Sequence, residues 1–393
     1  MSSAPFARSD DLRRLRDEGY DVELIDAHLL VKQVPYVDAS RQVKLGTLVS
    51  PVTFGGEQTA PNPDHKCWFI GNAPCDRHGN RLNAVINSET NTELAPGVRV
   101  NFLFSSKPNQ GYPDYHAKIV AYVRMLSCHA EALQPSADAH VFPTIAEPKE
   151  SGPFVYRDSA SSRAGIAALT DVFRNQHIAI VGLGGTGSYI LDYVSKTPVS
   201  EIHLFDGDRM LNHNAFRAPG AAPIEILETR PFKVDYLRAM YSKMHRGIVA
   251  HPYFITASTV GELAGVDFVF LAADQGMDKA AVVARLEELG KPFIDVGMGV
   301  ENVDGALTGL LRTTTSLPGR RDHVHLKNRI PLAGDGPPDD YASNIQIADL
   351  NSFNAVLAVM RWKRYLGFYA DLGGECYTTF SLTTNQIVNE DTP

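Results

Sequence analysis

The sequence has few cysteines, and it shows neither paired cysteines nor a secretory signal pattern. Only four cysteines occur in 393 residues and none stands in a C-x-x-C pair, which argues against a disulfide framework or a zinc knuckle and indicates a reducing compartment. Residues 1–16 carry charges but lack the apolar core that a signal peptide needs. The sequence therefore predicts a cytoplasmic protein.

Basic residues and long apolar runs are also scarce. The chain has 37 Lys and Arg against 45 Asp and Glu, so its net charge is −8 and we expect no broad surface for nucleic acid or anionic membranes. The longest apolar runs, 268–273 and 355–360, are far too short to cross a bilayer. These absences leave a soluble protein whose partners are neither nucleic acid nor a membrane.

The chain does have enough apolar residues for a sizeable core. At 44% hydrophobic and 21% charged it is neither disordered nor fibrous, and its length favours two domains. The stretch 135–153 has four prolines among Ser, Ala and Glu without sustained periodicity, which indicates a linker. We therefore predict one domain over residues 1–134, a linker over 135–153 and a second domain over 154–393.

The first domain alternates between helical and strand-like patterns. A capped helix is predicted over 10–18, and 115–133 has apolar residues at helical spacing. Between them come strand-like runs separated by Gly, Pro and Asn clusters, at 29–34, 45–49, 67–70 and 98–104. This order of helix, meander and helix predicts a smaller α+β domain, whose function the pattern alone does not reveal.

The second domain alternates strand and helix. A helix over 166–173 precedes the strand 177–181, and a Gly-rich turn leads into a helix that reaches Lys196. Further strands and a long helix are predicted at 201–205, 267–273, 292–296 and 351–365. The short apolar runs are typical of parallel strands covered on both faces, so the expected fold class is α/β, a doubly wound Rossmann-like domain.

A Gly-rich turn of this domain predicts a nucleotide site. Gly182, Gly184, Gly185 and Gly187 follow a strand and open a helix, and Asp206 closes the next strand. Glycines let the backbone approach phosphate oxygens, the helix N-terminus offers unpaired N–H groups, and the acid accepts ribose hydroxyls. A NAD-dependent dehydrogenase would use the same opening, so this motif alone does not identify the nucleotide.

The residues after Asp206 help to identify which nucleotide the site binds. Asp208, Asn214, Arg217 and Lys233 follow in order, and Asp274 closes a later strand. With the glycine turn, this series over residues 155–375 resembles the ThiF/MoeB/HesA family, the adenylating domains of ubiquitin-activating enzymes, and the spacing of Asp206, Asn214 and Arg217 is kept. The resemblance implies ATP and Mg²⁺ as cofactors.

The resemblance also implies roles for single residues. The four glycines, Asp206 and Asp208 would bind the nucleotide, with Asp206 on the ribose. Arg217 and Lys233 would hold phosphates, Asn214 would help to align them, and Asp274 would hold Mg²⁺ at the reacting centre. Attack of a carboxylate on the α-phosphate needs such cations and donors rather than a covalent nucleophile.

In the family an arginine from the partner subunit reaches into the neighbouring site. Arg163, 19 residues before Gly182 at the expected start of a helix, is our candidate, and Arg157 is the alternative. The resemblance therefore implies a homodimer, with Arg163 as a fourth catalytic residue beside Asp274, Arg217 and Lys233.

This sequence departs from many members of the family. It lacks the paired C-x-x-C motifs of a structural zinc site, and no cysteine lies between Gly182 and Gly374 to take a thioester. Lys279 stands where an arginine is expected. We therefore expect adenylation without any cysteine of this chain.

A second motif, His323 and His325, has the spacing of one strand face. No third ligand stands near, so a polar loop is favoured over a metal site. The acidic stretch 335–340 is most simply a solvated loop, and it could also border a channel for a partner's C-terminal tail.

The predicted function is ATP-dependent adenylation of the C-terminal carboxylate of a ubiquitin-like or sulfur-carrier protein. The first domain is interpreted as a partner-recruitment module with a conjugating-enzyme-like fold, or as a stabilising appendage, and a separate conjugating enzyme is a further expected partner. Two alternatives stay open at this point. A NAD-binding oxidoreductase would leave Asn214, Arg217 and Lys233 unexplained, and a non-catalytic nucleotide-binding scaffold would have no need for Asp274.

Overall fold

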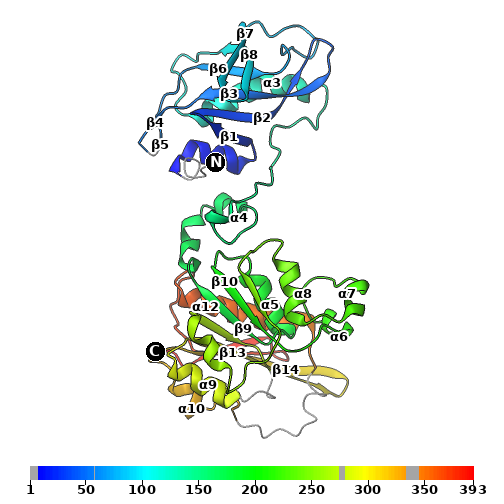
Figure 1. The fold of residues 1–393 in the computed structure, drawn as a ribbon, viewed down its shortest axis with the longest axis vertical. Helices are drawn as coiled ribbons and strands as arrows, with labels where there is room; N and C mark the ends of the chain where they lie inside the picture. The colour runs from blue at the N-terminus through cyan, green and yellow to red at the C-terminus, as the bar shows by residue number, and fades with distance from the viewer. Residues whose placement is uncertain (1–7, 57, 274–278, 333–344) are drawn as a thin grey trace. The chain divides into compact units, whose positions relative to one another are not determined.

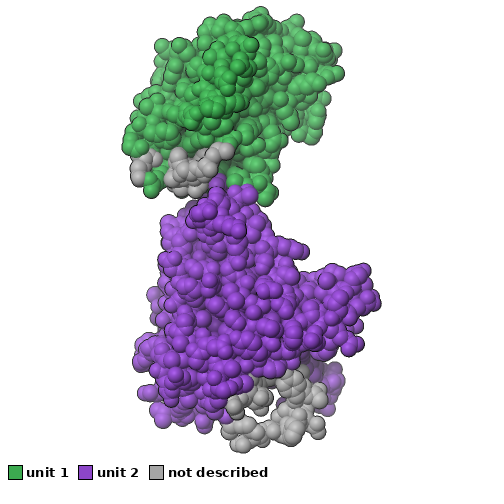
Figure 2. Space-filling view, viewed as in Figure 1, with its two compact units in different colours: residues 1–145 green, residues 146–393 purple. Residues whose placement is uncertain are grey.

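The computed structural model describes residues 8–56, 58–273, 279–332 and 345–393. Contacts divide the chain into two compact units, Met1–Ile145 and Ala146–Pro393, coloured separately in Figure 2. The predicted linker 135–153 falls across this division. Among the described residues, no helix combines the length and the apolarity that crossing a bilayer requires.

The first unit is built on an antiparallel sheet of six strands in the order β1-β2-β3-β6-β8-β7 (Figure 1). The bounds are β1 Asp21–Ile25, β2 His28–Val37, β3 Val43–Pro51, β6 Lys66–Ile70, β7 Ile86–Ala95 and β8 Val98–Ser105, and a small pair is β4 Phe54–Gly55 with β5 Gln58–Thr59. The four predicted strands lie within β2, β3, β6 and β8. The two strands that were not predicted, β1 and β7, are the edge strands, and the mostly exposed β7 has no apolar alternation to reveal it.

Among the described residues of this unit, two helices pack on one face of the sheet, and both were predicted from the sequence. They are α2 Asp10–Glu18 and α3 Tyr115–Glu131. Leu12 and Leu15 of α2 share one buried cluster with Ile119 and Tyr122 of α3 and with the inward side chains of the strands. The α+β class of this unit is confirmed.

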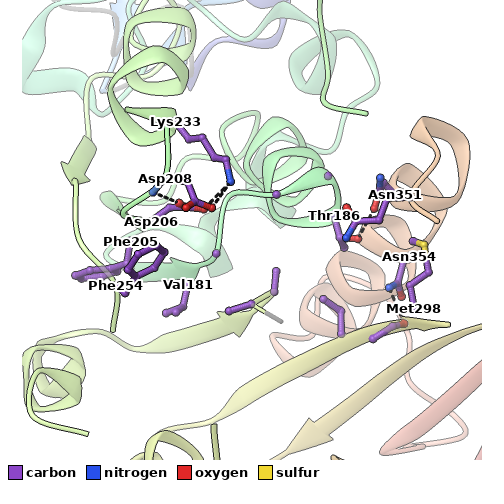
Figure 3. A pocket seen from close by; sticks show the side chains of 18 of the residues that line it. Val181, Thr186, Phe205, Asp206, Asp208, Lys233, Phe254, Met298, Asn351 and Asn354 are labelled. Atoms are coloured by element: carbon purple, nitrogen blue, oxygen red, sulfur yellow. Dashed lines mark hydrogen bonds and ion pairs between the residues drawn. The ribbon is translucent and has the colours of Figure 1, made fainter. Parts of the chain in front are cut away.

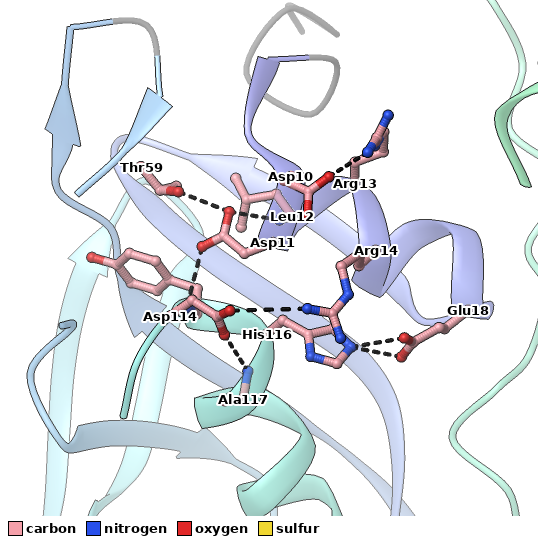
Figure 4. Close-up of polar contacts among 11 residues, drawn as sticks. Asp10, Asp11, Leu12, Arg13, Arg14, Glu18, Thr59, Asp114, His116 and Ala117 are labelled. Carbon is pink, nitrogen blue, oxygen red and sulfur yellow. Dashed lines mark hydrogen bonds and ion pairs between the residues drawn. The ribbon is translucent and has the colours of Figure 1, made fainter. Parts of the chain in front are cut away.

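Polar contacts fasten the start of α2 to the start of α3 (Figure 4). The buried Asp11 carboxylate accepts hydrogen bonds from Thr59 Oγ1 at 2.7 Å and from the backbone N–H of Tyr115 at 3.1 Å. Asp114 accepts from the backbone N–H of Ala117 at 2.7 Å and so caps α3. The two helices are therefore held in register by their N-terminal turns.

The second unit contains a mixed sheet of eight strands in the order β11-β10-β9-β12-β13-β14-β15-β16. The strands β9 to β13 pair in parallel and the rest pair antiparallel. Their bounds are β9 His177–Val181, β10 Glu201–Phe205, β11 Ile248–His251, β12 Phe268–Leu271, β13 Phe293–Val303, β14 Ala306–Ser316, β15 Tyr377–Ser381 and β16 Gln386–Glu390.

Helices cover both faces of the parallel strands, so the doubly wound class is confirmed. On one face α5, α8 and α12 share a core that includes Trp362, and on the other face η3, α9 and α10 pack around Val282. The helix bounds are η1 Lys149–Ser151, α4 Ser159–Arg163, η2 Ala167–Phe173, α5 Gly185–Val194, α6 Asn212–Ala215, α7 Ile224–Thr229, α8 Lys233–Tyr241, η3 Val260–Gly265, α9 Lys279–Glu288, α10 Asp322–Leu326 and α12 Ala348–Tyr365.

Three local expectations differ from the structure. The helix expected over 166–173 is the 3₁₀ helix η2. The run 292–296 marks only the buried start of β13, which continues as a half-exposed hairpin with β14. His323 and His325 lie on the short helix α10, so neither the strand face nor the polar loop proposed for them is present.

His245 follows α8 and is a buried histidine of the second unit. Its ring is fully buried, with Nε2 donating to the carbonyl of Val199 at 3.0 Å and Nδ1 accepting from the N–H of Gly247 at 3.1 Å. Only the neutral ring makes both bonds, and burial lowers the pKa of His245 from its usual 6.5 to about 4. The folded state therefore excludes a proton that the unfolded chain accepts.

We expect this histidine to destabilise the unit in acid. Because its folded pKa lies below the unfolded value, its contribution is complete above pH 6.5 and is lost as the pH falls towards 4, by about 3 kcal/mol in all. Denaturant unfolding of wild type and of His245→Gln at several pH values should show that the variant lacks this loss. The exposed His213→Gln is the control that should keep it, and equal pH dependence in all three proteins would contradict the prediction.

Candidate functional site

The carboxyl ends of the parallel strands surround a cavity of about 430 Å³ (Figure 3). Its lining includes residues at or just after the ends of β9, β10 and β12, residues within β13, residues of α5, α8 and α12, and the segment after β11. The order of the sheet reverses at β9, with β10 on one side and β12 on the other. Ligands of open α/β sheets bind at such a reversal, so this cavity is the candidate site.

The glycine turn contributes to the lining of the cavity. Gly182 has a φ of +90°, and a Cβ there would lie 2.7 Å from the carbonyl oxygen of Ala272, so this position requires glycine. Gly184 caps α5, and a Cβ on it would meet only open space. Gly182, Gly184 and Gly185 line the cavity, and Gly187 does not.

Gly187 has a packing role instead. A Cβ on this residue would lie 1.9 Å from the carbonyl oxygen of Gly182. The absent side chain therefore lets α5 sit directly against the turn, which brings the N–H groups of its first turn to the cavity.

The acids at the end of β10 position both the turn and a lysine. Asp206, 4% exposed, accepts hydrogen bonds from the backbone N–H groups of Leu183 and Asp208, both at 2.7 Å. Lys233 Nζ lies 2.7 Å from Asp208 Oδ2 and 3.7 Å from Asp206 Oδ2. Burial raises the pKa of Asp206, and Lys233 opposes that rise. The structure thus brings these three predicted residues together beside the turn.

Arg217 lines the cavity, whereas Asn214 does not. The Arg217 Nε is buried and has no hydrogen-bond partner among the residues that the structure describes. Asn214 Oδ1 accepts from the backbone N–H of Leu211 at 2.9 Å, and its carbonyl accepts from the N–H of Arg217 at 3.1 Å. Asn214 therefore holds the short segment that carries Arg217, and its alignment of phosphates stays a prediction.

Two predicted catalytic residues are not placed at the cavity. Asp274 lies outside the described residues, as does the stretch 335–340, and within the described part of the chain no group of three His, Cys, Asp or Glu side chains could hold a metal ion. Arg163 is exposed and ends α4, rather than starting it, because Asp158 caps the helix N-terminus through the N–H of Ser161. The alternative, Arg157, pairs with Glu147 at 2.7 Å.

Several lining residues were not singled out in the sequence. An apolar wall includes Phe205, Phe254 and Ile255, and a group of uncharged polar side chains comprises Thr186, Gln346, Asn351 and Asn354. The two asparagines carry one recognisable signal, since they interrupt the apolar face of α12 three residues apart.

Lys279 belongs to a buried ionic cluster. Its Nζ lies 2.5 Å from Asp295 Oδ1, and Arg312 Nη2 lies 2.7 Å from Asp295 Oδ2. Asp295 is fully buried in β13, beside strand residues that line the cavity. Lys279, which stands where an arginine was expected, therefore joins the first residue of α9 to β13 of the central sheet through this ion pair.

The remaining candidates lie away from the cavity. His323 Nε2 donates to the carbonyl of Thr315, and His325 pairs with Glu287, so the two histidines have separate partners. Cys67, Cys75 and Cys376 are buried, Cys128 is exposed, and none of the four lines the cavity. Burial raises the pKa of the Cys67 thiol to about 11.

Comparisons with known proteins agree with this picture. Residues 158–331 match the ThiF family, and residues 10–159 match a domain of unknown function, DUF6791. Ubiquitin-like modifier-activating enzyme 5 of Culex quinquefasciatus is 26% identical over 167 residues, which cover 40% of this chain and 42% of that protein. This chain therefore aligns with about two fifths of that relative's length.

Among solved structures, E. coli MccB with AMPCPP and MccA matches with a TM-score of 0.47 and 16% identity, covering 60% of this chain and 70% of that chain. MccB with ATP matches with a TM-score of 0.45 and 15% identity, covering 60% and 69%. The two family matches make residues 158–331 a domain of the ThiF family, preceded by a DUF6791 domain at residues 10–159.

Proposed function

We propose that this chain uses ATP to adenylate the C-terminal carboxylate of a small ubiquitin-like or sulfur-carrier protein. The observation that carries the proposal is a single cavity that joins the α5 N-terminus, Lys233, the unpartnered Arg217 Nε and Asp206. In this reaction ATP supplies the adenylyl group, because a carboxylate oxygen bonds to the α-phosphorus and pyrophosphate leaves with the electron pair of the broken P–O bond.

The residues of the cavity suit each part of that nucleotide. The N–H groups of the α5 first turn, Arg217 and Lys233 would face the phosphates of ATP. Such donors and cations stabilise negative charge most where water is excluded. Phe205, Phe254 and Ile255 offer an apolar wall for a base, and Asp206 stands where a ribose hydroxyl would bind. NAD would not need both Arg217 and Lys233 in the lining of the cavity. The two cations therefore favour a nucleoside triphosphate over NAD as the ligand.

Three further parts of the proposal rest on the family resemblance. Asp274 would hold Mg²⁺, which neutralises phosphate charge when bound. Arg163 would act across a homodimer interface. The DUF6791 domain would recruit the protein substrate or a separate conjugating enzyme. The name of the mosquito relative supports the substrate class, since that protein activates a ubiquitin-like modifier.

Pyrophosphate–ATP exchange tests the proposal. The candidate substrates are small proteins that end in glycine and are encoded by neighbouring genes. Each should be tested separately, because pyrophosphate–ATP exchange requires a substrate whose C-terminal carboxylate is adenylated. The same protein with its C-terminal carboxylate converted to an amide is the control and should give no exchange. Calorimetry should show ATP binding and little NAD binding. Tight NAD binding without ATP binding would contradict the adenylation function.

A further inference from the structure

The cavity has two polar sides of different character. Among the described residues that line it, four are charged, namely Asp206, Asp208, Arg217 and Lys233, and all four come from the segment between the end of β10 and the start of α8. The other side, which we call the amide end, comprises Thr186, Gln346, Asn351 and Asn354, from α5, from α12 and from the residue pair before it. In Figure 3 Asn351, Thr186 and Asn354 lie across the cavity from Lys233 and the two aspartates.

Asn351 has an unused hydrogen-bond donor at this end. The residue is 1% exposed, and its Oδ1 accepts a hydrogen bond from Thr186 Oγ1 at 3.0 Å. Its Nδ2 is buried and has no hydrogen-bond partner within the described part of the chain. Asn354, one turn later, differs because its Nδ2 donates to the carbonyl of Gly297 at 3.0 Å and its Oδ1 accepts from Thr313.

The surroundings of Asn351 fix its amide against the glycine turn. A Cβ on Gly185 would lie 2.1 Å from Asn351 Nδ2, so the two residues are in direct contact at the first turn of α5. Thr186 holds the Oδ1 and thereby sets the orientation of the amide. A buried amide donor without a partner is costly, and a ligand that supplies an acceptor removes that cost.

The chemistry of the site indicates which ligand atom this is. The two cations of the cavity lie on the charged segment and suit phosphate oxygens. In phosphoryl transfer the attacking and leaving oxygens lie roughly in line, so a carboxylate approaches from the side away from the leaving pyrophosphate. The uncharged amide end is that side, and a neutral donor binds a carboxylate oxygen without forming an ion pair that would blunt its attack.

We propose that Asn351 Nδ2 binds the carboxylate of the substrate's last residue and then the carbonyl oxygen of the acyl adenylate. This inference rests on the proposed adenylation. Thr186 is the positioning residue, because it acts through Asn351. The amide end is therefore the acyl subsite of the cavity.

Two stable analogues separate the acyl subsite from the nucleotide subsite. One is adenosine sulfamate, and the other is the same molecule with N-acetylglycine joined to the sulfamate nitrogen. Calorimetry on the full chain gives the ratio of their affinities. In Asn351→Leu, which removes the donor at similar volume, we expect the acylated analogue to bind about tenfold more weakly and the plain sulfamate to bind within twofold of wild type.

Two further variants make the result decisive. Asn351→Asp keeps the shape and the acceptor for Thr186, so it should fold and still lower the affinity ratio. Ser352→Ala removes the neighbouring α12 hydroxyl, which contacts Tyr193 and not the cavity, and should leave the ratio unchanged. An unchanged ratio in both Asn351 variants, or equal losses for both analogues, would overturn the role of Asn351. Failure of wild type to bind either analogue would instead overturn the proposed adenylation.

Discussion

Lys233→Met is expected to weaken ATP binding by about a hundredfold, because a charge-assisted contact to phosphate is lost from a water-poor cavity. Lys233 is nearly buried, at 6% exposure, its ammonium lies 2.7 Å from Asp208, and the residue lines the cavity. Calorimetric titration with ATP measures the effect directly.

The same change should destabilise the second unit by about 3 kcal/mol at neutral pH, because it leaves the buried Asp206 carboxylate without its cation. Burial already raises the pKa of Asp206 above 3.8, and removing Lys233 raises it further. In the variant, protonation of Asp206 therefore stabilises the folded state relative to the unfolded chain. The deficit of the variant should therefore be complete above the folded pKa and shrink as the pH falls towards 3.8.

Lys196→Met is the matched control. This lysine is half-exposed on the same unit and pairs with Asp192 at 2.7 Å, outside the cavity. Its replacement should change stability by less than about 0.5 kcal/mol and leave ATP binding alone. Wild-type ATP affinity in a folded Lys233→Met protein would show that Lys233 serves Asp206 and Asp208 alone.

Much of the fold could be predicted because its core strands are continuous in sequence. The apolar runs before Gly182 and around 268–271 are buried on both faces, and this is the pattern of a parallel strand. The strands β14, β15 and β16 gave no such signal, because their threonines and half-exposed side chains fit an antiparallel extension as well as a loop. The edge strands β1 and β7 were not predicted either, because most of their side chains are also only partly buried or exposed.

The candidate site also has residues that could be predicted from the sequence and residues that could not. The glycine turn and Asp206 could be predicted because they follow one another through a single passage from β9 through α5 to the end of β10, whereas Lys233, at the start of α8, was a candidate only through the family resemblance. Asn351 could not be predicted, because it lies 165 residues from Thr186 and meets it only when α12 packs on α5. Linear spacing carries no information about that contact. Polar residues on an otherwise apolar helix face are the one sequence feature that points to it.

The glycines of the turn, which look equivalent in sequence, should differ in how much their substitution lowers stability. Gly187→Ala is expected to destabilise the second unit by about 3 kcal/mol, because the new Cβ would lie 1.9 Å from a backbone oxygen that cannot move without shifting the turn. Denaturant unfolding measures this loss. ATP binding should fall with it, since α5 would no longer sit against Gly182.

Gly184→Ala should instead lower ATP binding without lowering stability. The φ of Gly184 is −72° and its Cβ would enter open space, so the unfolding free energy should change by less than about 1 kcal/mol. That open space is the cavity itself, and the added methyl group stands where backbone N–H groups must approach a phosphate. ATP affinity should therefore fall by about tenfold or more in a protein as stable as wild type. If Gly184→Ala binds ATP as wild type does, the phosphates do not lie over this turn, and the glycines serve only the packing of α5 against the sheet.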